Sequence, residues 1–249
     1  MLRKFLRPIM PLLRWIKRGG KPIARDTRTM LRMEIAARYL RGQGLEIGAL
    51  HMPLPPPRNI HVRYVDRMSV ADLRKHYPEL HGYQLVDVDV IDNGEELFSI
   101  PTASVDFVIA NHLIEHTQDP TRSLENWLRV IRPQGVLYLA VPHKLQTFDR
   151  ERPVTSLEHL IRDYREGTEW SRFGHFEEYV RMVEKVPENQ IEARARELME
   201  QDYSIHFHVW TETAFLEYLL HCQNHFGLPF AIELFQMNEI EFVLILRKL

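Results

Sequence analysis

Two histidines and an aspartate stand where they could move a proton. His112 and His143 each closely follow an apolar run, and Asp149 comes shortly after His143. An imidazole accepts a proton from a hydroxyl near neutral pH, and a carboxylate orients the imidazole or the acceptor. We therefore take His112, His143 and Asp149 as candidate catalytic residues that orient an acceptor or remove its proton.

A second group of residues has the types that bind a nucleoside. Its members are Glu46, Gly48, Ala49, Asp66, Asp92, Asn93 and Asn111. An acid that closes a strand offers two acceptor oxygens to the two hydroxyls of a ribose, and a glycine lets the backbone approach a ligand closely. The phosphate-binding patterns GxxxxGK(S/T) and GxGxxG do not occur in the chain. The spacing therefore favours a nucleoside cofactor without phosphates.

A third pattern, His206 and His208, raises the question of a metal. Alternate residues of an extended segment point the same way, so the two imidazoles could share a ligand. Zinc sites need a third protein ligand and usually a fourth, and neither CxxC nor HExxH accompanies the pair. From the sequence we expect no metal site.

The elements that must position these residues alternate between strands and helices. Strands are predicted at 44–48, 61–66, 85–91, 106–110, 135–141, 230–235 and 240–247, and helices at 27–41, 69–80, 119–132 and 211–225. This order predicts an α/β fold with a Rossmann-like, mostly parallel sheet that closes in a C-terminal antiparallel hairpin. The charged stretch at about 145–205 lacks strand signals, so we expect a helical lid inserted into a domain of residues 27–249.

The predicted first helix, 27–41, carries an apolar set that could face the sheet: Met30, Ile35, Ala36 and Leu40. In open parallel sheets, ligands bind beyond the carboxyl ends of the strands. The nucleoside-binding residues named above, together with His112 and His143, all fall at such strand ends. Sequence order alone thus brings the candidate residues to one edge.

Four segments resemble, in order, the motifs of class I S-adenosylmethionine-dependent methyltransferases. They read LEIGALHMPL, YVDRMS, SIPTASVDFVIANHLIEHTQDP and LRVIRPQGVLYLAVP. The resemblance covers roughly residues 44–142, more loosely 205–247, and is closest to the small-molecule, type 11-like group that includes the ubiquinone-biosynthesis O-methyltransferases. The later glycines of the cofactor loop are replaced here by Leu50 and Met52.

The resemblance implies S-adenosylmethionine as the cofactor and a role for each matching residue. Glu46 and Gly48 match the first acid and first glycine of the cofactor loop, and Asp66 matches the ribose-binding acid. Asp92 or Asn93 falls near the adenine edge. Asn111 matches the residue under the methionine moiety.

The expected reaction is methyl transfer to a small polar acceptor. Oxygen is favoured over nitrogen as the site of methylation, and a sugar or glycan is a candidate acceptor. The alternative from another class is a catalytically silent methyltransferase-like module that binds a partner. A nucleotide-sugar enzyme is disfavoured, because the phosphate cradle is missing.

The charge of the chain is divided unevenly. Residues 1–25 hold eight Lys or Arg and no acid, so the remainder carries a formal charge of −10 out of a total of −2. An acidic body argues against nucleic-acid binding. The basic segment 1–26, with apolar residues at helical spacing within 1–22, is expected to pack on its own domain or stay mobile, with contact to an anionic membrane surface or a targeting role as the alternatives.

The expected location is cytoplasmic, with membrane association through the basic segment as the alternative. Cys222 is the single cysteine, so no internal disulfide forms and a reducing compartment suits the chain. No stretch approaches the roughly 18 apolar residues of a membrane-spanning helix.

Overall fold

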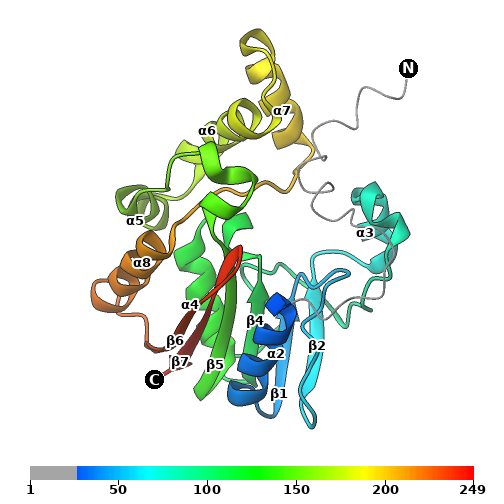
Figure 1. Cartoon of the computed structure of the whole chain (residues 1–249), viewed down its shortest axis with the longest axis vertical. Coiled ribbons are helices and arrows are strands. Elements are labelled where there is room, and N and C mark those ends of the chain that lie inside the picture. The colour runs from blue at the N-terminus through cyan, green and yellow to red at the C-terminus, as the bar shows by residue number, and fades with distance from the viewer. Residues whose placement is uncertain (1–26) are drawn as a thin grey trace.

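The core of the protein is one seven-stranded sheet in the order β3-β2-β1-β4-β5-β7-β6 (Figure 1). The computed structural model describes residues 27–249, so the expectations for the basic segment 1–26 lie outside the described part. The strands are β1 (Gln43–Ile47), β2 (His61–Asp66), β3 (Val90–Ile91), β4 (Val105–Asn111), β5 (Ile131–Pro142), β6 (Phe230–Asn238) and β7 (Glu241–Lys248). The first five pair in parallel, and β7 runs antiparallel to both β5 and β6. The predicted α/β fold class and closing hairpin are confirmed.

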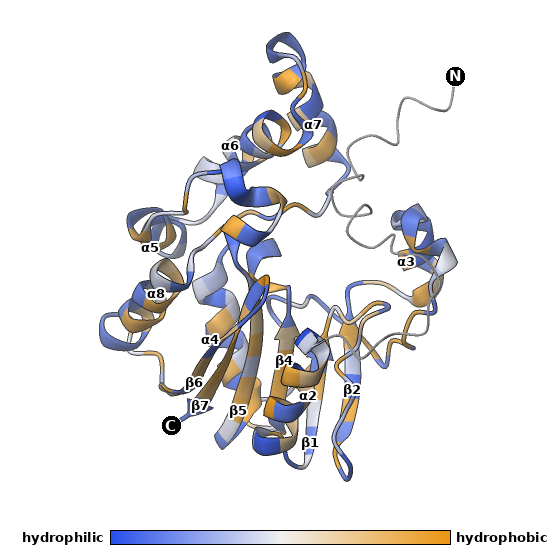
Figure 2. Ribbon diagram, viewed as in Figure 1, coloured by the Kyte–Doolittle hydropathy of each residue, from blue (hydrophilic) through white to orange (hydrophobic). Residues whose placement is uncertain are grey.

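Helices cover both faces of the sheet. The helix α2 (Thr27–Tyr39) packs on one face with an apolar cluster that includes Phe107 and Tyr138. On the other face, α4 (Pro120–Val130) and α8 (Glu212–Asn224) pack with a larger cluster around Trp127 and Phe215. Figure 2 shows the apolar residues concentrated along the central strands. Burial on both faces explains why β4 and β5 are nearly continuous apolar runs.

The stretch between β5 and α8 consists of short helices with an apolar core of their own. They are α5 (Leu157–Glu166), α6 (Glu169–Tyr179), α7 (Ile191–Glu200), the π-helix η5 (Val180–Glu184), and the 3-10 turns η3 (Lys144–Gln146), η4 (Phe148–Glu151) and η6 (Glu188–Gln190). Phe176, Val180 and Leu198 are buried in this separate core. Figure 1 shows α5, α6 and α7 grouped at one end of the sheet, apart from its faces.

Two predicted elements are shorter in the structure. The helix expected at 69–80 is α3 (Val70–His76), capped by Ser69, whose Oγ accepts the Asp72 N–H at 3.2 Å. Pro78 lacks a backbone donor and so ends it, and the 3-10 turn η1 (Pro78–Gly82) follows. The strand expected at 85–91 is reduced to Val90–Ile91. The chain before it makes isolated backbone hydrogen bonds instead of a continuous ladder; for example, Val86 N donates to Leu50 O at 2.8 Å.

The buried face of α2 differs from the predicted one. Met30 is exposed, whereas Ile35, Ala36 and Arg32 are buried. Arg32 takes an inward position because an acid from another part of the chain meets it there, as described below. No helix among the described residues 27–249 is long and apolar enough to cross a membrane.

Candidate active site

The register of the parallel strands brings three predicted residues into one row. Ile47 of β1 lies opposite Val65 of β2 and Ala110 of β4. The next residue of each segment is Gly48, Asp66 and Asn111, respectively. All three therefore stand at the carboxyl edge of the sheet, where ligands of such folds bind.

Gly48 turns the chain at the end of β1. Its φ is +65°, a left-handed conformation that side-chain-bearing residues adopt at a cost, and its N–H donates to Val65 O at 2.9 Å. Ala49 follows and lines a narrow crevice together with Asp66. The Asp66 carboxylate accepts the Arg67 N–H at 2.7 Å, and burial raises the pKa of this carboxyl although nearby donors oppose the shift.

Asn111 has a polar atom that the protein leaves unsatisfied. Its Nδ2 donates to Glu46 Oε1 at 3.3 Å, while its Oδ1 is buried without a hydrogen-bond partner. A buried acceptor without a donor costs free energy that a bound ligand with an N–H group would recover. Asn111 therefore could accept a hydrogen bond from the amino-bearing end of a nucleoside cofactor, and Asp66 lies two strands away at the same edge, on the far side of β1.

Glu46 is committed to holding the proline-rich loop that follows β1. Both carboxylate oxygens accept the Leu54 N–H, at 2.9 and 3.1 Å. Burial raises the pKa of this carboxyl to about 7, although the donors Leu54 and Asn111 and the charge of Arg32 oppose the shift. The residue thus anchors the loop and, through Asn111, borders the site.

Glu46 makes folding stability depend on pH. Its folded pKa of about 7 exceeds the ordinary value of 4.5, so between these values the folded chain keeps a proton that the unfolded chain has lost. The unfolding free energy therefore falls as pH rises through this window, by at most about 3 kcal/mol from this group. Chemical denaturation should show that the slope in this window is smaller in Glu46→Gln. Identical pH dependence of the two proteins would contradict the assignment.

Asp92 and Asn93 brace their own loop beside Asp66. The Asp92 N–H donates to Asp66 O at 3.0 Å, and the Asp92 carboxylate accepts Ser99 N at 2.7 Å and Ser99 Oγ at 2.6 Å. Burial would raise the pKa of this carboxyl, but the bonds from Ser99 and the backbone outweigh it and lower the pKa. Asn93 accepts the Glu95 N–H at 2.8 Å. The predicted adenine contact of Asp92 or Asn93 stays a prediction.

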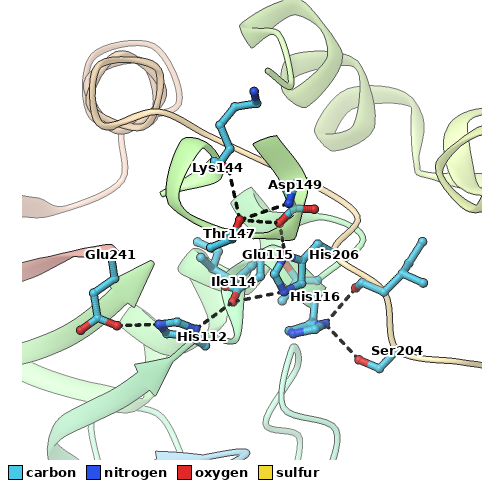
Figure 3. A network of polar contacts seen from close by, with 12 residues as sticks. His112, Ile114, Glu115, His116, Lys144, Thr147, Asp149, Ser204, His206 and Glu241 are labelled. Carbon is cyan, nitrogen blue, oxygen red and sulfur yellow. Dashed lines mark hydrogen bonds and ion pairs between the residues drawn. The ribbon is translucent and has the colours of Figure 1, made fainter. Parts of the chain in front are cut away.

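His112 is held by a buried acid that sequence reasoning missed. Its backbone has a φ of +49°, and its Nε2 lies 2.6 Å from Glu241 Oε2 (Figure 3). Glu241 also accepts Nε and Nη2 of Arg32 and Nδ2 of Asn238. Burial would raise the pKa of Glu241, yet the bonds from His112 and Arg32 hold it at about 2. The carboxylate is ionised and can only accept, so the Nε2 of His112 donates a proton to it.

The sequence carries a signal for Glu241. It is the first residue of β7, directly before the apolar run Phe242–Leu246, and it pairs with Pro142 at the end of β5. Because β7 is antiparallel, its beginning lies at the same edge as the ends of the parallel strands. An acid at that position is therefore a candidate site residue.

The other two catalytic candidates have their polar atoms occupied within the protein. His143 accepts the Leu145 N–H on Nδ1 at 3.2 Å, and its Nε2 lies 2.6 Å from Glu212 Oε2. Asp149 is buried and accepts Arg152 Nη1 at 2.9 Å and His206 Nδ1 at 2.7 Å. These contacts outweigh burial and hold the pKa of Asp149 at about 2. The roles predicted for His143 and Asp149 stay predictions.

Beside His112, one acid and two further imidazoles converge. The ligand atoms of Glu115, His116 and His206 lie within 4.8 Å of one another, and both carboxylate oxygens of Glu115 are buried without a hydrogen-bond partner. His116 Nδ1 lies 2.8 Å from Ile205 O, so each imidazole is oriented by a partner on its Nδ1 (Figure 3). Two imidazoles and a carboxylate are a set that a divalent cation could bind.

The comparisons with known proteins agree with this geometry. Residues 46–139 match the family described as "Methyltransferase domain". A probable S-adenosylmethionine-dependent methyltransferase of Mycolicibacterium smegmatis is 31% identical over 80 residues, which is 32% of this chain and 28% of the relative. One from Mycobacterium tuberculosis is 32% identical over 91 residues, 36% of this chain and 30% of the relative. The chain thus spans less than a third of the length of these curated relatives.

A solved structure from Rhodobacter sphaeroides shares the fold. It bears the name of a Zn-dependent alcohol dehydrogenase, is 14% identical and superposes with a TM-score of 0.52 over 97% of this chain and 95% of its own. At that identity the likeness shows the fold alone. The strand order, the row of Gly48, Asp66 and Asn111, and the matched segment 46–139 agree with one another and with the similarity of this chain to S-adenosylmethionine-dependent methyltransferases.

Proposed function

We propose that this protein transfers a methyl group from S-adenosylmethionine to a hydroxyl of a small polar acceptor, with a sugar or glycan as the favoured class. The observation that carries the proposal is the contact of the buried Glu241 with the partly exposed His112 at the strand edge, next to Asn111. A carboxylate behind an imidazole sets its tautomer and supports its role as a base. An acceptor hydroxyl needs such a base.

Three neighbouring strand ends would hold the cofactor. Asp66 would bind the ribose hydroxyls, the Gly48–Ala49 backbone would lie against the nucleoside, and Asn111 Oδ1 would accept from the amino group. When bound, S-adenosylmethionine supplies an electrophilic methyl group on a sulfonium. Nδ1 of His112 would take the proton of the acceptor as its oxygen attacks.

The polar character of the acceptor follows from the side chains around His112. Glu115, His116 and His206 border it, and the carboxylate of Glu115 has oxygens that no group among the described residues satisfies by a hydrogen bond. These side chains place several hydrogen-bonding groups beside His112. A hydroxyl-rich molecule suits these groups better than a flat hydrophobic one.

Calorimetry with S-adenosylmethionine tests the cofactor half of the proposal. The wild type is expected to bind, and Asp66→Ala to bind about 100-fold more weakly, since two hydrogen bonds to a charged group are lost. Asp87→Ala, which removes an exposed acid from the loop before β3, is the matched control and should bind as the wild type does. Absence of binding by the wild type at millimolar cofactor would overturn the proposal in favour of a silent binding module.

A further inference from the structure

A second cluster of imidazoles lies between the helices that follow β5 and the segment that leads into α8. His159 and Asp163 share one face of α5 at i,i+4 spacing, His175 comes from α6, and His208 precedes α8. One ligand atom from each of the four lies within 4.8 Å of the others. The cluster shares no residue with Glu115, His116 and His206.

The separations within this cluster suit a shared ion. His159 Nε2 lies 3.0 Å from His175 Nε2 and 3.1 Å from Asp163 Oδ2. Four ligands at zinc–nitrogen and zinc–oxygen distances in a tetrahedron stand about 3.3 Å apart. The two separations are close to that value.

Two buried atoms of the cluster have no hydrogen-bond partner. They are Asp163 Oδ2 and His208 Nδ1, from residues that are fully buried. The other oxygen of Asp163 accepts Ser171 Oγ at 2.9 Å, and His208 Nε2 lies 3.0 Å from Gln118 O. Outer partners of this kind orient the ligands of metal sites. Hydrogen bonds within the protein thus satisfy Asp163 Oδ1 and His208 Nε2, whereas Asp163 Oδ2 and His208 Nδ1 have no hydrogen-bond partner.

We propose that His159, Asp163, His175 and His208 form a zinc site that is separate from the methyl-transfer site. Three imidazoles and one monodentate carboxylate make a closed, four-coordinate set, which is typical of structural zinc. A cavity of about 370 Å³ lined by His159, His175 and Ser171 adjoins the cluster and gives the ion a route from solvent.

The site ties together three parts of the chain. The ion would cross-link α5, α6 and the segment 205–210, which also carries His206 beside the acceptor region. A zinc ion here would therefore fix the helices above the strand edge. It would stabilise the fold, because the ligands come together only in the folded chain.

Cobalt substitution tests the proposal directly. The full-length protein, freed of metal with a chelator, is titrated with Co²⁺ and then with Zn²⁺. We expect one equivalent of Co²⁺ with the strong visible absorption of tetrahedral cobalt, displacement by Zn²⁺, and a rise in the melting temperature with either ion. His175→Gln and the partly exposed His159→Gln should each lose the absorption while keeping the circular dichroism of the metal-free wild type.

Two control variants separate this site from other histidines. His221→Ala/His225→Ala removes a stacked surface pair on α8 and should leave the tetrahedral absorption unchanged. His116→Ala removes a member of the other cluster and should also leave it unchanged. If the absorption disappears in His116→Ala and persists in His175→Gln, or if no stoichiometric Co²⁺ binds, the proposal is wrong. Neither outcome depends on S-adenosylmethionine, so the test is independent of the proposed methyl transfer.

Discussion

Arg32→Ala is expected to lower the unfolding free energy by about 3–5 kcal/mol, because it leaves a buried carboxylate without its main cation. Glu241 is fully buried, and Arg32 meets it with Nε at 2.7 Å and with Nη2. His112 and Asn238 remain as donors but supply no permanent charge. The charge of Glu241 then lacks compensation in an environment where it is costly.

Chemical denaturation followed by circular dichroism measures this loss. Arg38→Ala is the matched control, since it removes the same side chain from an exposed position of the same helix and should change stability by less than about 0.5 kcal/mol. The double variant Arg32→Met/Glu241→Leu should recover much of the loss, because both buried charges are gone. If Arg32→Ala is no less stable than Arg38→Ala, the pair does not stabilise the fold.

His112→Ala is expected to lower kcat for methyl transfer by about 10²–10⁴-fold, the usual contribution of a positioned base. The affinity for S-adenosylmethionine should change little, because the cofactor contacts proposed for Asp66 and Asn111 remain. The loss should therefore be in kcat and not in the KM for the cofactor, and stopped assays of methyl transfer onto a panel of hydroxyl-bearing sugars and glycans measure it.

A matched imidazole provides the control for this variant. His61 is exposed at the opposite end of β2, so His61→Ala should leave kcat unchanged. Full activity of His112→Ala would show that the proton of the acceptor is removed by another group, or that the acceptor needs no base.

The local pattern of the sequence was sufficient to predict the sheet and the row of residues that lies at the carboxyl edge of β1, β2 and β4. Apolar runs between helical segments set β1, β2, β4 and β5. The position of Gly48, Asp66 and Asn111 at one edge of the sheet is therefore predictable from the sequence, because the end of a parallel strand is a local feature that the sheet then aligns. The predicted helix starts at Ser69 and Asp119 are caps in the structure, where Ser69 Oγ accepts the Asp72 N–H and Asp119 Oδ1 accepts the Arg122 N–H.

Contacts between segments that are far apart in the sequence could not be predicted from such local patterns. Arg32 and Glu241 are 209 residues apart, and the antiparallel return of β7 brings them together beside His112. Arg32 looked like a surface position of an amphipathic helix, and its burial is explained only by the acid it meets.

The histidines also differ in what the sequence predicts and what only the tertiary structure determines. His206 and His208 alternate along one extended segment, so the sequence suggested a single pair without further ligands. In the folded chain His206 joins Glu115 and His116, whereas His208 joins His159, Asp163 and His175. Local periodicity determines which face a side chain takes, but its polar partner is set by where the packing of the whole chain places other elements. The sequence by itself therefore determined the sheet and its ligand-binding edge, and the tertiary structure decided which charges and imidazoles meet there.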